Sequence, residues 1–143
     1  MELKYKAINI RTKQVSEQVT ILQDGLVEIE WTSGALTKYL PEQIDRDLTR
    51  YFSKQLTKEI NLVRWIGLTD KNGRRIFEDD IVAITEDDGY KTQYLVCWDP
   101  QQNQFCLHWL AFVRGGQYVK QLSDVKLCES EITNTALLLT DPS

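Results

Sequence analysis

The chain has 143 residues and a net charge of -4, with 42% hydrophobic and 27% charged residues. This length suits one domain or two small lobes that share a core, and the composition excludes a chain with long disordered segments. A net acidic surface repels phosphate backbones, so nucleic acid is an unlikely partner. The N-terminal residues lack the apolar stretch of a signal peptide, and no run approaches the ~20 apolar residues of a membrane span. We therefore expect a soluble protein inside the cell.

The first part of the chain carries strand signals, followed by a helical period. Residues 4–10 alternate polar and apolar side chains, and residues 19–31 predict a hairpin with Asp24-Gly25 as its turn. Apolar residues then recur at intervals of three and four, at Ile44, Leu48, Tyr51, Phe52 and Leu56. Because Pro41 suits the first turn of a helix, we predict one long helix over residues 41–59.

The second part of the chain alternates short apolar runs with turn signals. Asn72 and Gly73 both tolerate the positive φ of a tight hairpin, so they predict a structural turn. Gly67 lies in the preceding strand, where glycine marks a bulge or a close backbone approach. Further turns divide the remaining residues into five short strands at near-regular spacing, which favours a small barrel.

The predicted fold class is mainly β with one long helix, an α+β fold. An N-terminal β-hairpin and helix lobe covers residues 1–62, and an SH3-like β-barrel covers residues 63–143. The barrel type rests on fold analogy, because a polar corner followed by Asp-Ile-Val is a common entry into such barrels. Whether the two parts are separate domains or share one core stays open.

The most specific motif lies between residues 67 and 82. Its segments are Gly67-Leu68, Asp70-Lys71-Asn72-Gly73, Ile76-Phe77-Glu78 and Asp80-Ile81-Val82. They resemble the signature of the YopX family, small proteins carried by bacteriophages and prophages, which is approximately Tyr-Thr-Gly-Leu, Asp-Lys-Asn-Gly and Ile-Tyr-Glu-Gly-Asp-Ile-Val. Asp79 stands where the family usually has Gly, and Asp tolerates left-handed backbone geometry better than most residues. The resemblance implies a β-rich phage accessory protein in the cytoplasm of a bacterial host, and the family has no known activity to transfer.

Cys106 and His108 are the strongest candidates for chemistry. They are two residues apart on a predicted strand, so a thiol and an imidazole share a face and could act as nucleophile and base. The neighbouring residues are apolar, which favours a histidine of the core or of a strand edge. Three scattered cysteines and one histidine do not supply a four-ligand zinc site. We expect no enzymatic activity, no cofactor and no structural metal.

Acidic residues gather after the motif and form the candidate partner-binding surface. Its members are Asp79, Asp80, Asp87 and Asp88. Such acids also serve as a solvated rim that keeps sheet edges from pairing, and whether they collect a divalent cation stays open. Tyr51 and Phe52 on the predicted helix are candidates for self-association into a homo-oligomer, with packing inside one chain as the alternative.

The leading hypothesis is a non-enzymatic accessory protein that binds a protein, either of the host or a second copy of itself. The alternative is a nucleic-acid-associated barrel that uses Arg64, Arg74 and Arg75, with Trp65 and Phe77 as stacking neighbours. These bases are dispersed beside acidic residues, so their electrostatic footprint is weak. An enzyme that uses Cys106 and His108 is the third hypothesis.

Overall fold

The structure is a computed structural model, and it describes residues 4–45, 58–99, 101–110 and 119–135. The chain divides into two compact units, Met1–Trp65 with Leu137–Ser143, and Ile66–Ala136. Strands make up most of the regular structure in both units. Within the described ranges the only helices are three-residue 3-10 turns, at Pro41–Gln43, Leu122–Asp124 and Leu127–Glu129.

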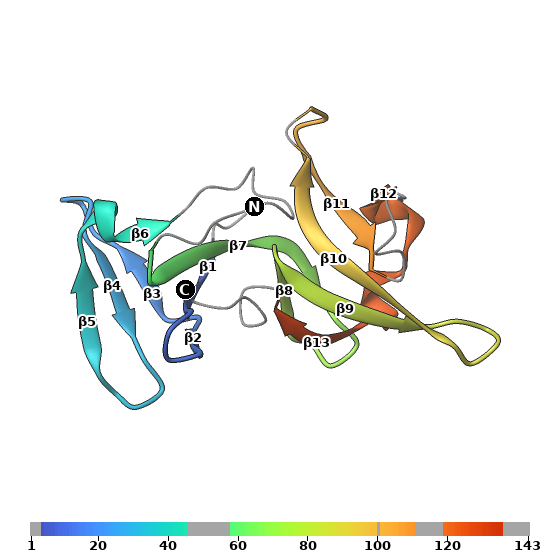
Figure 1. The fold of residues 1–143 in the computed structure, drawn as a ribbon, viewed down its shortest axis with the longest axis horizontal. Helices are drawn as coiled ribbons and strands as arrows, with labels where there is room; N and C mark the ends of the chain where they lie inside the picture. Colours follow the sequence, from blue (N-terminus) through green and yellow to red (C-terminus); the bar gives the residue numbers. More distant parts are fainter. Residues whose placement is uncertain (1–3, 46–57, 100, 111–118, 136–143) are drawn as a thin grey trace. The chain divides into compact units, whose positions relative to one another are not determined.

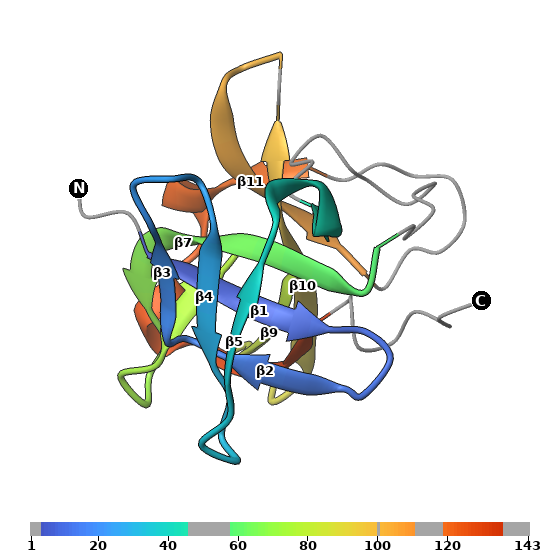
Figure 2. The same cartoon turned by 90° about the vertical axis from the view of Figure 1, so that its left-hand side faces the viewer.

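The first unit contains two sheets. Its strands are β1 (Tyr5–Asn9), β2 (Gln14–Ser16), β3 (Val19–Ile21), β4 (Val27–Glu30), β5 (Leu36–Tyr39), β6 (Ile44–Asp45) and β7 (Ile60–Thr69), the last of which continues into the second unit. One sheet has the order β2-β1-β7-β6, and the other has the order β3-β4-β5. Strand β6 pairs with β7 in parallel, whereas β1 pairs antiparallel with both β2 and β7, and β4 with both β3 and β5. Figure 2 shows β3, β4 and β5 side by side.

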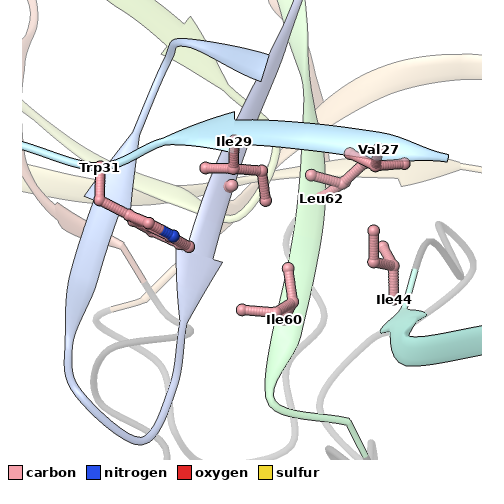
Figure 3. Close-up of a cluster of buried hydrophobic side chains, with 7 residues drawn as sticks. Val27, Ile29, Trp31, Ile44, Ile60 and Leu62 are labelled. Atoms are coloured by element: carbon pink, nitrogen blue, oxygen red, sulfur yellow. The ribbon is translucent and has the colours of Figure 1, made fainter. Parts of the chain in front are cut away.

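The two sheets of the first unit bury one shared core. Its residues are Ala7, Val27, Ile29, Trp31, Ile44, Ile60 and Leu62. Ile29 on β4 and Leu62 on β7 come from different sheets, and Figure 3 shows this cluster gathered between the strands. Burying each of its Val, Leu and Ile side chains stabilises the fold by about 1.5–3 kcal/mol, so this core contributes strongly to the stability of the unit.

The predicted long helix over residues 41–59 is wrong where the structure describes it. Pro41–Gln43 forms a single 3-10 turn, and the next residues form β6. Ile44 is buried and lies opposite Ile60, because packing of this β-branched side chain between the sheets outweighs the helical period in the sequence. Residues 46–57, including Tyr51 and Phe52, lie outside the described residues, so the self-association prediction stays a prediction. No helix in the described part of the chain is long and apolar enough to cross a membrane.

The second unit is built on a five-stranded antiparallel sheet with the order β12-β11-β10-β9-β13. The strands that begin in the second unit are β8 (Arg75–Phe77), β9 (Asp80–Thr85), β10 (Lys91–Asp99), β11 (Gln104–Trp109), β12 (Val119–Gln121) and β13 (Glu131–Thr135) (Figure 1). Strand β8 pairs with β7 instead of joining this sheet. A second core fills this unit, made of Ile66, Ile76, Val82, Tyr94, Val96, Leu107 and Leu127.

The expected α+β fold is therefore corrected to a nearly all-β fold. The pairings among the described residues form an open path in the second unit, with β12 and β13 at its two edges. Among the described residues they do not show the closed barrel that the regular strand spacing predicted, and the SH3-like type, which rests on fold analogy, stays a prediction. Strand spacing alone cannot distinguish an open sheet from a barrel, because closure depends on which strands pair at the ends.

Four hairpin turns share one five-residue backbone pattern. They are Leu22–Leu26, Trp31–Ala35, Asp70–Arg74 and Glu86–Tyr90. In each turn, the N–H of the first residue donates to the carbonyl of the fifth, and the N–H of a glycine at the fourth position donates to the carbonyl of the first. These glycines have φ between 78° and 89°, as in a type I turn followed by a left-handed residue. Gly73 is thus left-handed, whereas Asn72 is not among the residues with positive φ.

We predict that Gly73→Ala lowers the free energy of unfolding by about 1–2 kcal/mol, because the added Cβ strains a left-handed backbone. A Cβ at Gly73 meets nothing within 4 Å, so the backbone alone causes this loss. Gly89→Ala should cause a similar loss, since Gly89 occupies the same turn position with a left-handed φ and equally open space. Denaturant unfolding measures both variants. An unchanged midpoint for Gly73→Ala would show that this residue is not left-handed in solution.

Candidate functional site

The segment that carries the family-like motif contains three left-handed positions. Gly67 has φ 91°, Gly73 has φ 78° and Asp79 has φ 68°. Gly67 adopts this conformation inside β7, as a glycine at a bulge or a close backbone approach does. Asp79 adopts the left-handed geometry at the position where the family usually has Gly. The two glycines and Asp79 of the motif therefore stand where the backbone is left-handed, a conformation that Gly and Asp tolerate.

The Asp70 side chain accepts several hydrogen bonds in this segment. It is 4% exposed, and its Oδ1 accepts the N–H groups of Asn72 and Arg74, both at 2.9 Å. Its Oδ2 accepts the N–H of Ile132 on β13 at 3.1 Å and faces Arg74 Nε at 3.4 Å. The Arg74 guanidinium also donates to the Ile132 carbonyl. One carboxylate thus joins a hairpin turn to a strand 62 residues further along the chain.

The Asp70 turn differs from its three counterparts in where the accepting side chain stands. In the other turns the third residue, Asp24, Ser33 or Asp88, accepts the N–H of the fifth residue. Here the first residue does so from inside the protein. Burial raises the pKa of Asp70, but the N–H groups of Ile132, Arg74 and Asn72 and the charge of Arg74 outweigh burial, and the net pKa is lowered. Asp70 is therefore a buried, ionised structural acid.

The four predicted partner-binding acids do not share one exposed face. Asp80 is 0% exposed, and its Oδ2 accepts the N–H of Phe77 at 2.8 Å. Asp79 is half-buried, and its own N–H donates to the Val96 carbonyl at 2.7 Å. Asp87 and Asp88 are exposed in the turn between β9 and β10. Of the four acids, only this last pair is fully exposed, and their role in partner binding stays a prediction.

The three predicted nucleic-acid-binding arginines belong to different units. Arg64 is half-buried on β7 in the first unit, and Arg74 and Arg75 lie in the second. The Arg74 guanidinium is engaged by Asp70 and by the Ile132 carbonyl, so it has a structural role. Nothing in the described contacts favours the nucleic-acid alternative, which stays a prediction.

Cys106 and His108 lie together, and the fold adds Cys97 to them. Cys97 is directly opposite Cys106 in the β10–β11 pair, and their Sγ atoms are 3.1 Å apart. All three residues are buried. Burial lowers the pKa of His108, so its imidazole is neutral at neutral pH, and burial raises the pKa of the Cys97 thiol. The hydrogen bond with the Cys97 thiol lowers the pKa of Cys106 and outweighs the opposite effect of burial. The enzyme hypothesis for Cys106 and His108 stays a prediction.

The exposed edge of β5 is a surface that the sequence did not reveal as functional. Leu36 is 60% exposed and Leu40 is 48% exposed. Strand period places both on one face with the exposed Lys38 between them. Among the described residues, β5 pairs with β4 alone, so its other side has no strand neighbour. Figure 2 shows β5 at the end of the three-stranded sheet.

The backbone of β5 presents hydrogen-bonding groups along this edge. The Trp31 N–H donates to the Ala35 carbonyl at 2.9 Å, which fixes one hydrogen-bonded pair of the β4–β5 ladder. Because such pairs alternate in antiparallel sheets, Leu36 and Lys38 direct their N–H and C=O groups away from β4. At Leu40 the outward N–H already donates to Gln43 Oε1 at 2.8 Å. We name Leu36, Lys38 and Leu40, with these backbone groups, the β5 edge.

The sequence contains a weak signal for this edge. Leu36-Thr-Lys-Tyr-Leu40 alternates as a strand with apolar residues at both ends of one face, but a strand pattern does not say whether its neighbour is present. Cys97 was likewise missed, because its partnership with Cys106 depends on the exact register of β10 and β11.

The fold and the motif segment together define a nearly all-β chain whose motif is structural. A family model described as YopX protein matches residues 15–136, and the chain belongs to the YopX family, as the resemblance predicted. The crystal structure of protein EF1440 from Enterococcus faecalis is similar, with a TM-score of 0.53 and 17% identity over 96% of this chain and 95% of that chain. At this identity the similarity extends to the fold alone. A search of curated proteins finds no match.

We predict that Asp70→Asn lowers the free energy of unfolding at neutral pH by about 2–3 kcal/mol, because hydrogen bonds to a charged acceptor are lost. The native pKa of Asp70 is lowered, so its contribution is present above about pH 4 and disappears as the pH falls through the folded-state pKa. The two proteins should therefore converge in stability in acid. Denaturant unfolding between neutral pH and about pH 2 measures this.

Asp88→Asn is the control for Asp70→Asn, since Asp88 accepts one N–H in an exposed turn of the same kind. It should change stability by less than about 0.5 kcal/mol. A difference between native protein and Asp70→Asn that does not shrink as the pH is lowered from about 4 would contradict the charged role of Asp70.

Proposed function

We infer that this YopX chain is a non-enzymatic, phage-type accessory protein that binds another protein by adding a strand of that partner to the β5 edge. The observation that carries this proposal is the combination of outward backbone groups at Leu36 and Lys38 with two strongly exposed leucines on one face. Backbone hydrogen bonds supply affinity in strand addition, and alternate side chains supply specificity. Proteins usually protect free edges from such pairing, so an edge that has leucines beside it and no strand neighbour among the described residues supports a binding role.

The side chains of the β5 edge specify the partner chemistry. A strand added beside β5 places its own alternate residues next to Leu36, Lys38 and Leu40. Lys38 lies between the two leucines along the strand and is exposed, with its Nζ 3.9 Å from Glu28 Oε2. The partner segment that fits is extended, with apolar residues at its first and fifth positions and an acidic residue at the third.

This chemistry favours a different protein over a second copy of the chain. If two β5 strands paired antiparallel about a two-fold axis at Lys38, each Lys38 would face its own equivalent. Like charges directly opposite each other destabilise a strand pair. The homo-oligomer predicted from Tyr51 and Phe52 would have to use another surface.

The variant Lys38→Pro tests strand addition directly. Proline removes the outward N–H of residue 38, and a sheet accepts proline where that N–H faces solvent. We predict a folded protein whose dissociation constant for its partner rises at least about tenfold, because a backbone hydrogen bond and the approach of the partner strand are both lost. Lys38→Gln keeps the N–H and is the matched control for loss of charge.

The partner is obtained by affinity capture from host lysate, using native protein and both variants in parallel. A captured protein qualifies only if Lys38→Gln retains it and Lys38→Pro loses it. Binding constants for that protein then follow from titration with purified components. If Lys38→Pro retains every captured protein as well as the native chain does, strand addition along β5 is ruled out.

A further inference from the structure

The fold gathers three metal-binding side chains at one place in the second unit. Cys97 and Cys106 face each other across β10 and β11, and His108 follows Cys106 by two residues on the same face of β11. The ligand atoms of these residues all lie within 4.8 Å of one another. Cys97 and Cys106 are each 3% exposed, and His108 is 8% exposed.

We propose that Cys97, Cys106 and His108 bind one Zn²⁺ ion. Two thiolates and one imidazole are ligands that zinc takes in tetrahedral sites, at about 2.3 Å for sulfur and about 2.0–2.1 Å for nitrogen. A single ion can therefore contact all three atoms after small side-chain rotations. Three protein ligands leave the fourth position for a water molecule.

Charge balance favours zinc in this buried place. The two thiolates balance the charge of Zn²⁺, so the ion and its three protein ligands together carry no net charge. This matters because burying a net charge is costly. A monovalent soft ion such as Cu⁺ would leave one negative charge uncompensated. The half-buried Asp99 follows Cys97 by two residues, so it adds a negative group on the same face and further favours a divalent ion.

The site goes beyond the proposed function, because it lies in the second unit and has no part in the β5 edge. It also opposes the expectation that scattered cysteines exclude a metal. The register of the β10–β11 hairpin brings two of the three cysteines together, whereas Cys128 stands apart in an exposed 3-10 turn.

The test titrates Zn²⁺ into the full chain, purified with a chelator and kept reduced, and counts bound zinc by elemental analysis. We expect one ion per chain. Titration with Co²⁺ should give the absorption of thiolate-to-cobalt charge transfer and of a tetrahedral centre, and Zn²⁺ should remove both. Cys106→Ser and His108→Gln should weaken zinc binding at least about tenfold, because loss of a ligand exceeds the effect of an outer-shell change.

Cys128→Ser is the matched control and should bind zinc as the native chain does. The Co²⁺ spectrum of the native chain decides the question even if a ligand variant does not fold. The proposal is overturned if the reduced native chain binds no stoichiometric zinc, or if Cys128→Ser weakens binding as much as Cys106→Ser. An intact mass that is lower than the fully reduced mass by two hydrogens, measured under the reducing conditions, also overturns the proposal. Cys97 and Cys106 would then form a disulfide.

Discussion

The buried carboxylate of Asp70 is the interaction on which the second unit depends most. It accepts hydrogen bonds from the N–H groups of its own turn and of Ile132, so one carboxylate connects residues that are far apart in the sequence. A buried carboxylate is tolerable only when donors surround it, and removing them would leave an uncompensated charge. The Lys71 N–H donates in parallel to the Ser130 carbonyl at 2.8 Å. The turn and the start of β13 are thus held together by several bonds at one end of the sheet.

This arrangement explains why the YopX motif is rich in acids and small residues. Asp70 and Asp80 are buried acceptors of backbone N–H groups, and Gly67, Gly73 and Asp79 supply left-handed backbone. The motif thus stabilises its own segment of the fold. The partner-binding surface that we propose is the β5 edge in the first unit, where the backbone groups of Leu36 and Lys38 point away from β4 and Leu36 and Leu40 are exposed.

Local signals in the sequence predicted more of this structure than long-range ones did. The turns at Gly25 and Gly73 follow from residue chemistry alone, since a left-handed position favours glycine. Ile44 was misassigned to a helix because its burial between two sheets depends on residues far along the chain. The same limit applied to Asp80, which lies among acids in the sequence but inside the fold, and to Cys97, whose partner is set by strand register.

Amide hydrogen exchange resolved by residue tests most directly whether the Asp70 carboxylate joins its turn to β13. The turn at Glu86–Tyr90 provides an internal reference, because its Tyr90 N–H donates to the exposed Asp88. The account predicts slow exchange at Arg74 and Ile132, near the rate set by global unfolding, and fast exchange at Tyr90. Exchange at Arg74 and Ile132 as fast as at Tyr90 would contradict it.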